Sequence, residues 1–232
     1  MRFPHALIAV LCAALMLSVA PSASAEADVE AFAKSTIDGG LAILRESGTR
    51  TDRRRRFHAF IVPLVDPRKT GLFTLGVYRR GAAPATLDAF VQVFREYSIA
   101  IYETRLDNYK NATLTVSGSR ENAPGDNVVN TIATAPTLRE PVRIAFRVSG
   151  TKGNFKVIDI QVAGIWLSIE LRDEFRALLS ANGGSIENLT SVLADRTKTM
   201  LSDADTAMLG DMPGNYPHGS LAISMLVHEW IR

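Results

Sequence analysis

Residues 141–162 read PVRIAFRVSGTKGNFKVIDIQV, and this stretch decides the fold. Its first half alternates apolar residues with polar or small ones, which predicts a half-buried strand; the apolar positions are Val142, Ile144, Phe146 and Val148. Residues 155–162 predict a second strand, and the segment between the two contains Gly150 and Gly153, which is typical of a hairpin turn. The stretch therefore predicts two adjacent antiparallel strands with one apolar face and one solvated face.

The segments on either side of this hairpin supply more strands and then helices. The period of two recurs at residues 113–117 and 128–135, upstream of the hairpin. Apolar residues at helical spacing predict helices over residues 28–46, 53–63, 67–75 and 85–109 before the strands, and over 165–180 and 185–200 after them. Helices, then consecutive strands, then helices predict an α+β fold in which helices cover a bent, largely antiparallel sheet.

The helix predicted over residues 85–109 carries a wide aromatic stripe that includes Phe94, Tyr97 and Ile101. A stripe of this width is a buried face, either plain core or the wall of a pocket. We expect Phe94, Tyr97 and Ile101 to face Phe146 and Ile160 of the sheet across an apolar pocket. Trp166, at the start of the next predicted helix, is expected near its mouth.

The first 25 residues have the three parts of a secretory signal peptide. Arg2 begins a weakly basic start, an apolar run covers residues 6–20, and Ala23-Ser24-Ala25 is a small-residue cleavage site. We expect cleavage after Ala25 and a single domain over residues 26–232. Cys12 is the only cysteine and lies in the apolar run, so the mature chain would have no disulfide and no thiolate site.

Charge and motifs argue against several classes of function. The chain has 26 Lys and Arg against 24 Asp and Glu, without the strongly basic balance typical of broad nucleic-acid binding. It contains no nucleophile elbow, phosphate loop or dinucleotide fingerprint, and no histidine pair at metal-ligand spacing. We therefore expect no catalytic residues, no metal and no cofactor.

The sharpest charge feature is the run Arg53, Arg54, Arg55 and Arg56. Such a run is either a solvated start of a helix or a site where anionic headgroups or a partner protein dock. His58, which follows it, has the same two interpretations: a headgroup contact or a solvent-facing side chain.

Several segments, taken in order, resemble the MlaC-type phospholipid-binding family, also called the toluene-tolerance family. The most specific is Gly153-Asn154-Phe155-Lys156-Val157-Ile158-Asp159, followed by Gly164-Ile165 and by Arg172-Asp173-Glu174-Phe175. The resemblance covers most of residues 28–201. Trp166 and Leu171 depart from the common pattern, and Arg172–Phe175 with Asn182-Gly183-Gly184 is similar to a hopanoid-associated branch, HpnM.

The resemblance implies a soluble periplasmic carrier whose sheet and helices enclose an apolar pocket. Its cargo would be a phospholipid or a hopanoid-type lipid, contacting Phe94, Tyr97, Ile101, Phe146, Ile160 and Trp166. Its partners would be an outer-membrane lipoprotein complex and an inner-membrane transporter complex of the ABC or RND type. No metal or cofactor is implied.

Two other functions stay open on the residues alone. One is a small hydrolase or isomerase on a sheet of the nuclear transport factor two-like type, which would need inward Asp, His or Tyr side chains. Asp159 is the only acid on the predicted strands of residues 141–162. The other is an adaptor that binds only protein, whose pocket would be filled by its own side chains.

Overall fold

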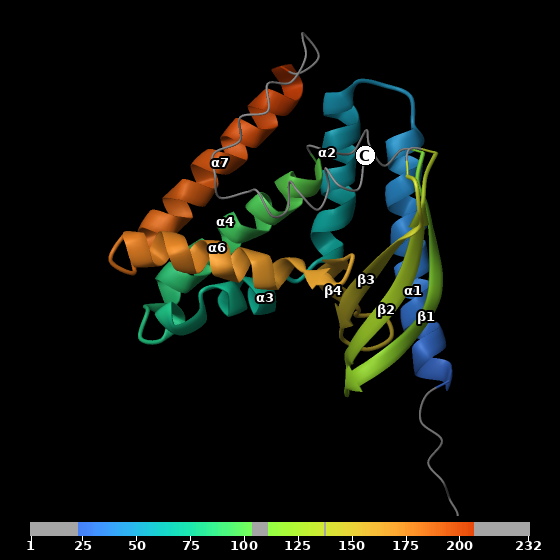
Figure 1. Cartoon of the computed structure of the whole chain (residues 1–232), viewed down its shortest axis with the longest axis horizontal. Coiled ribbons are helices and arrows are strands. Elements are labelled where there is room, and N and C mark those ends of the chain that lie inside the picture. Colours follow the sequence, from blue (N-terminus) through green and yellow to red (C-terminus); the bar gives the residue numbers. More distant parts are fainter. Residues whose placement is uncertain (1–22, 104–110, 137, 207–232) are drawn as a thin grey trace, which may run out of the picture.

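The computed structural model describes residues 23–103, 111–136 and 138–206. Four helices come first: α1 (Ala23–Arg45), α2 (Arg50–Ile61), α3 (Pro67–Thr74) and α4 (Pro84–Glu103). Strands β1 (Thr113–Ala123), β2 (Asp126–Thr134), β3 (Val142–Ser149), β4 (Lys156–Val162) and β5 (Ile165–Trp166) follow. Helices α6 (Leu167–Ala181) and α7 (Ile186–Thr206) come last, so the order of elements confirms the predicted α+β class (Figure 1).

The strands form one antiparallel sheet in the order β1-β2-β3-β4-β5. Its register places Val129, Phe146 and Ile160 side by side on β2, β3 and β4. Helix α1 runs along the sheet, where Val29 and Ala33 pack against Val129 and Val148 (Figure 1). The alternation in residues 141–162 thus predicted the central hairpin correctly.

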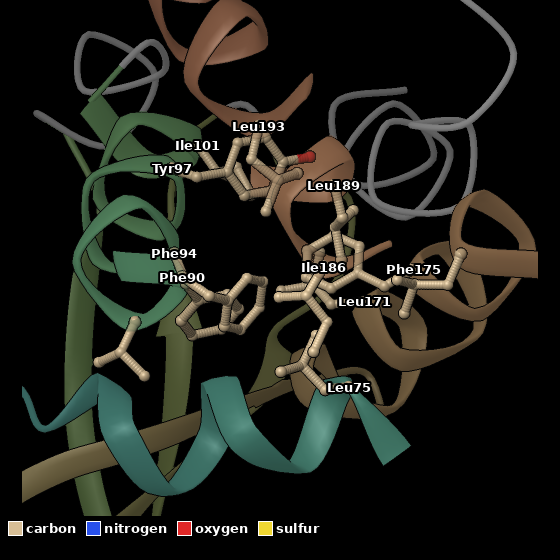
Figure 2. Close-up of a cluster of buried hydrophobic side chains, with 12 residues drawn as sticks. Leu75, Phe90, Phe94, Tyr97, Ile101, Leu171, Phe175, Ile186, Leu189 and Leu193 are labelled. Atoms are coloured by element: carbon tan, nitrogen blue, oxygen red, sulfur yellow. The ribbon is translucent and has the colours of Figure 1, made fainter. Parts of the chain in front are cut away.

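A second apolar cluster joins α3, α4, α6 and α7 on the other side of the molecule (Figure 1). Its centre is Phe175, which has no exposed surface and lies with its ring 6.2–6.3 Å from the rings of Phe90, Phe94 and Tyr97. Figure 2 shows side chains of α4, α6 and α7 pointing toward one another above α3. Helix α2 stands between this group of helices and α1 (Figure 1).

The predicted helix over residues 165–180 begins two residues late. Ala163 and Gly164 have positive φ angles of 50° and 91°, as a tight two-residue hairpin turn requires, so Ile165 and Trp166 pair back onto β4. Helix α6 then starts at Leu167, and its cap comes from another element. The Asp159 carboxylate accepts hydrogen bonds from the Ser168 amide and hydroxyl. An anion at a helix N-terminus is favourable, which gives this acid a structural role.

Three predictions fall wholly or largely outside the described residues. They are the signal peptide over residues 1–25, the end of the long helix beyond Glu103 and the tail from residue 209. Within the residues that the structure does describe, no helix is both long enough and apolar enough to span a membrane.

A paired acid on the outer face of the sheet gives a test of the register. Arg147 donates two hydrogen bonds to Asp126, at 2.9 and 2.7 Å, and they hold the pKa of Asp126 below its usual 3.8. We expect Asp126→Asn to lower the free energy of unfolding at pH 7 by less than about 1 kcal/mol, because the pair is partly exposed. Because the pKa of Asp126 is lowered in the folded state, its ionised carboxylate stabilises the fold above pH 3.8. This stability is lost as the pH falls through the lowered pKa. Urea unfolding at pH 7 and pH 3 should therefore show a deficit that shrinks in acid, whereas a deficit of equal size at both pH values would contradict this assignment.

Candidate binding cavity

An apolar cavity of about 320 Å³ lies between the sheet and the helices, within the size range of ligand pockets. The sheet provides one wall through the faces of β1, β3 and β4. Its side chains there are Leu114, Ile144, Phe146, Val157, Ile160 and Val162. Strand alternation explains this wall, since Ile144 and Phe146 of β3 point inward while Arg143 and Arg147 are exposed.

Helices α1 and α2 provide a second wall. Helix α1 contributes Ile37, Leu41 and Leu44, and α2 contributes Phe57, Phe60 and Ile61. The two helices approach closely at Gly39, where a Cβ atom would lie 2.7 Å from the Phe60 ring. Glycine at this position lets the Phe60 ring lie against the backbone of α1.

Four of the six residues predicted to line the pocket do so. Phe94 and Ile101 of α4 and Phe146 and Ile160 of the sheet all border the cavity. Phe94 and Ile101 also belong to the buried cluster around Phe175 (Figure 2), so α4 contributes to both the cavity and the core.

Tyr97 does not border the cavity, which corrects its predicted position. It is 3% exposed and packs against Phe175 in the helical core. Its neighbours there include the ion pair between Glu174 of α6 and Arg196 of α7. Burial, together with the Glu174 charge, raises the pKa of Tyr97 to about 12. The helical stripe that contains Phe94, Tyr97 and Ile101 is wide enough for one edge to face core and the other to face the cavity.

Trp166, predicted near the mouth of the pocket, is not among the lining residues, although its neighbours Ile165 and Leu167 are. Trp166 of β5 pairs with Gln161 of β4. Ile165 of β5 pairs with Val162 of β4 and borders the cavity. Because adjacent strand residues point to opposite faces, the hairpin turns Ile165 inward and Trp166 away. Because the helix was predicted to start at Ile165, this strand alternation was not expected.

The arginine run is bonded largely to its own surroundings. Arg53 donates to the Gly48 carbonyl, Arg55 to Asp52, and Arg56 lies 3.0 Å from Glu46. Arg54 reaches the Leu201 carbonyl of α7 at 3.4 Å. The run therefore secures the start of α2. The side chain of Arg55 is 76% exposed in its ion pair with Asp52, whereas that of Arg56 is 41% exposed in its pair with Glu46.

His58 is paired, with its Nε2 atom 2.9 Å from Oε2 of Glu96 on α4. Arg95, which borders the cavity, donates to the other oxygen of the same carboxylate at 3.0 Å. Burial opposes ionisation of Glu96, but the hydrogen bonds from His58 and Arg95 lower its pKa below the usual value.

Few charged groups border the cavity in the described part of the chain. Arg95, Asp66, Asp159 and Glu170 are the charged residues of its lining. Burial raises the pKa of Asp159 although Ser168 donates to it, and burial with the nearby Glu174 raises that of Glu170. Apart from Asp159, the sheet residues of the lining are apolar. Asp159 is therefore the one residue among them of the Asp, His or Tyr type that a hydrolase or isomerase would need, and its carboxylate is bonded to Ser168 at the start of α6.

Sequence analysis missed the contribution of α1 and α2 to the cavity. The apolar periodicity of residues 28–46 was visible, but it does not distinguish packing on a sheet from lining a cavity. The sequence did contain a usable signal. In the short helix of residues 53–63 the four arginines come first, and the apolar residues Phe57, Phe60 and Ile61 follow them.

Comparison with known proteins identifies the family. The model of the MlaC protein family matches residues 34–195, which is more than half of the chain. The chain belongs to the MlaC family. The resemblance carried by residues 153–159 and 164–175 is thereby confirmed at the level of the family, and the HpnM branch stays a prediction.

A solved structure is similar over most of the fold. It is a phospholipid-binding protein from Ralstonia solanacearum in complex with a phospholipid. That protein is 26% identical, with a TM-score of 0.63, and the match covers 76% of this chain and 98% of the other. The α+β fold described above is thus also found in a protein that holds a lipid.

Proposed function

We propose that this MlaC protein is a periplasmic carrier that shields the acyl chains of a phospholipid or a hopanoid-type lipid. The apolar cavity between the sheet and helices α1, α2 and α4 carries this proposal. Phe94, Ile101, Phe146 and Ile160 are proposed to contact the acyl chains, together with Phe57, Phe60 and Leu41. The phospholipid in the Ralstonia solanacearum protein supports the same type of cargo here.

Simple energetics explain why a carrier needs such a cavity. Each methylene exposed to water costs about 0.8 kcal/mol, so the roughly 30 methylenes of a two-chain lipid would cost over ~20 kcal/mol. An apolar lining removes most of this cost without binding lipid more tightly than a membrane does. Release into a second membrane then stays possible.

The cellular route is part of the same proposal. The carrier would move lipid between an outer-membrane lipoprotein complex and an inner-membrane transporter complex of the ABC or RND type. The arginine run at residues 53–56 is proposed to meet anionic headgroups or one of these partners, chiefly through Arg55. All four arginines donate to backbone or acidic groups of the chain, and Arg55 is chosen because its side chain is 76% exposed while it pairs with Asp52.

Lipid transfer between two populations of vesicles tests the carrier function. Donor vesicles hold a fluorescent phospholipid with a quencher, and the purified mature protein should raise the transfer rate in proportion to its concentration. Arg55→Gln should slow transfer to anionic acceptors at low salt and have little effect at high salt. A rate equal to that without protein would contradict the carrier function, while an unaltered Arg55→Gln rate at every salt concentration would refute only the docking role.

Export is the remaining prediction on this route. The N-terminal sequence of protein recovered from the periplasm should begin at Glu26, because Ala23-Ser24-Ala25 is the predicted cleavage site. Recovery of the protein with Met1 in the membrane fraction would instead identify residues 6–20 as an anchor.

A further inference from the structure

We infer that α2 is the gate of the cavity: lipid enters and leaves between α2 and α4, and bound lipid completes the apolar contacts that hold α2 in place. This inference rests on the proposed carrier function. The first observation that supports it concerns what the apolar side of α2 contacts. Phe57, Phe60 and Ile61 border the cavity, and no residue of α2 is buried.

Other helices of the molecule differ in this respect. Leu189 and Leu193 of α7 are at most 1% exposed within the core cluster, and so are Phe175 and Leu179 of α6. Their apolar faces meet protein, whereas much of the apolar face of α2 meets the cavity. Helix α2 also contacts α1, where the rings of Phe60 and Phe57 lie close to Gly39 and Gly40.

Part of the seam between α2 and α4 is polar and accessible to solvent. It includes the pair of His58 and Glu96, whose side chains are 38% and 42% exposed. Exposed ion pairs contribute little to stability, so separating these two groups is easy. Glu96 keeps its hydrogen bond from Arg95 when His58 moves away, so opening leaves this carboxylate with a partner.

The two ends of α2 are held differently. Beyond its C-terminal end, Val65 pairs with Val157 of β4, and the Asp66 amide donates to the Val157 carbonyl at 3.0 Å. The turn before its N-terminal end contains Gly48, whose φ angle of 128° is one that side chains rarely allow. We place the fixed end of the gate at Val65. Opening moves the N-terminal end away from α4, and this movement must break the contacts of Arg54 with Leu201 and of Arg56 with Glu46.

Hydrogen exchange measured by mass spectrometry tests whether cargo holds α2. The mature protein is compared after delipidation and after loading with palmitoyl-oleoyl phosphatidylethanolamine. Loading should slow amide exchange in peptides within residues 50–61 by about tenfold or more and change residues 186–206 by less than about twofold. Equal exchange of α2 in both forms, with bound lipid verified by native mass spectrometry, would overturn the gate. Failure to load any lipid would instead count against the carrier function.

A cross-link across the seam tests the route itself. The predicted mature chain has no cysteine, so His58→Cys with Glu96→Cys gives one defined pair, joined by a short bismaleimide after folding. The matched control is Arg68→Cys with Asp88→Cys, which replaces an exposed ion pair of 2.6 Å between α3 and α4. Cross-linking at the seam should slow lipid uptake and release about tenfold or more, and capping the same cysteines with N-ethylmaleimide should not. Equal rates for the seam and control cross-links would place the entrance elsewhere.

Discussion

Replacing Ile144 with tryptophan is expected to leave the protein folded and to weaken lipid binding about tenfold or more. Ile144 lies on β3 with its side chain at the cavity, paired across the sheet with Thr131 and Val162. The larger indole ring would occupy space that the acyl chains need. A loss of 1.4 kcal/mol in contact energy already corresponds to about a tenfold loss in affinity.

The matched control is Ile132→Trp on the neighbouring strand. Ile132 pairs with Arg143 and lies on the opposite face of the sheet from Ile144. Lipid binding by titration and thermal melting are measured for both variants. The account requires Ile144→Trp alone to lose lipid while it melts close to the wild type. If Ile144→Trp instead lowers stability by about 1–3 kcal/mol and its folded fraction binds lipid normally, Ile144 lies in solid core.

Replacing Phe175 with alanine is expected to lower the free energy of unfolding by about 3–5 kcal/mol. The ring has no exposed surface and contacts aromatic residues of α4, so its removal leaves a cavity where α4 and α6 meet (Figure 2). A loss of this size is a large fraction of the total stability of a typical domain. Urea unfolding at neutral pH measures it.

A second phenylalanine provides the comparison for this variant. Phe73 of α3 is only partly buried, and its ring lies 4.7 Å from the Arg172 guanidinium. Phe73→Ala should cost clearly less, because solvent already reaches the ring and an exposed cation–π contact contributes about 0.5–1 kcal/mol. Equal losses for the two variants would show that Phe175 is not the centre of the helical core.

Much of the fold could be predicted from local pattern, and the exceptions have local causes. The alternation in residues 142–148 predicted β3, and the apolar residues of 155–162 after a glycine-containing turn predicted β4. The start of α6 was misplaced because the turn at Ala163 and Gly164 is followed by only two strand residues. An apolar pair such as Ile165 and Trp166 fits a helix as well as a strand.

The candidate site was harder to predict, because lining a cavity and filling a core use the same residue types. Phe94 and Tyr97 lie on one helical stripe, yet one borders the cavity and the other packs against Phe175. Only the positions of α6 and α7 around α4 separate these roles. The arginine run gave no sign of its bonds to Gly48, Glu46 and Leu201, since these depend on how α1 and α7 pass α2.

Native mass spectrometry of the protein purified from its own periplasm, without added detergent, tests whether the cavity holds a lipid in the cell. The account predicts a species heavier than the polypeptide by the mass of one lipid, and extraction of the same sample with organic solvent should release that lipid. The released mass also distinguishes a phospholipid from a hopanoid-type cargo. A polypeptide that carries no lipid as isolated, and takes up none from vesicles, would contradict the account.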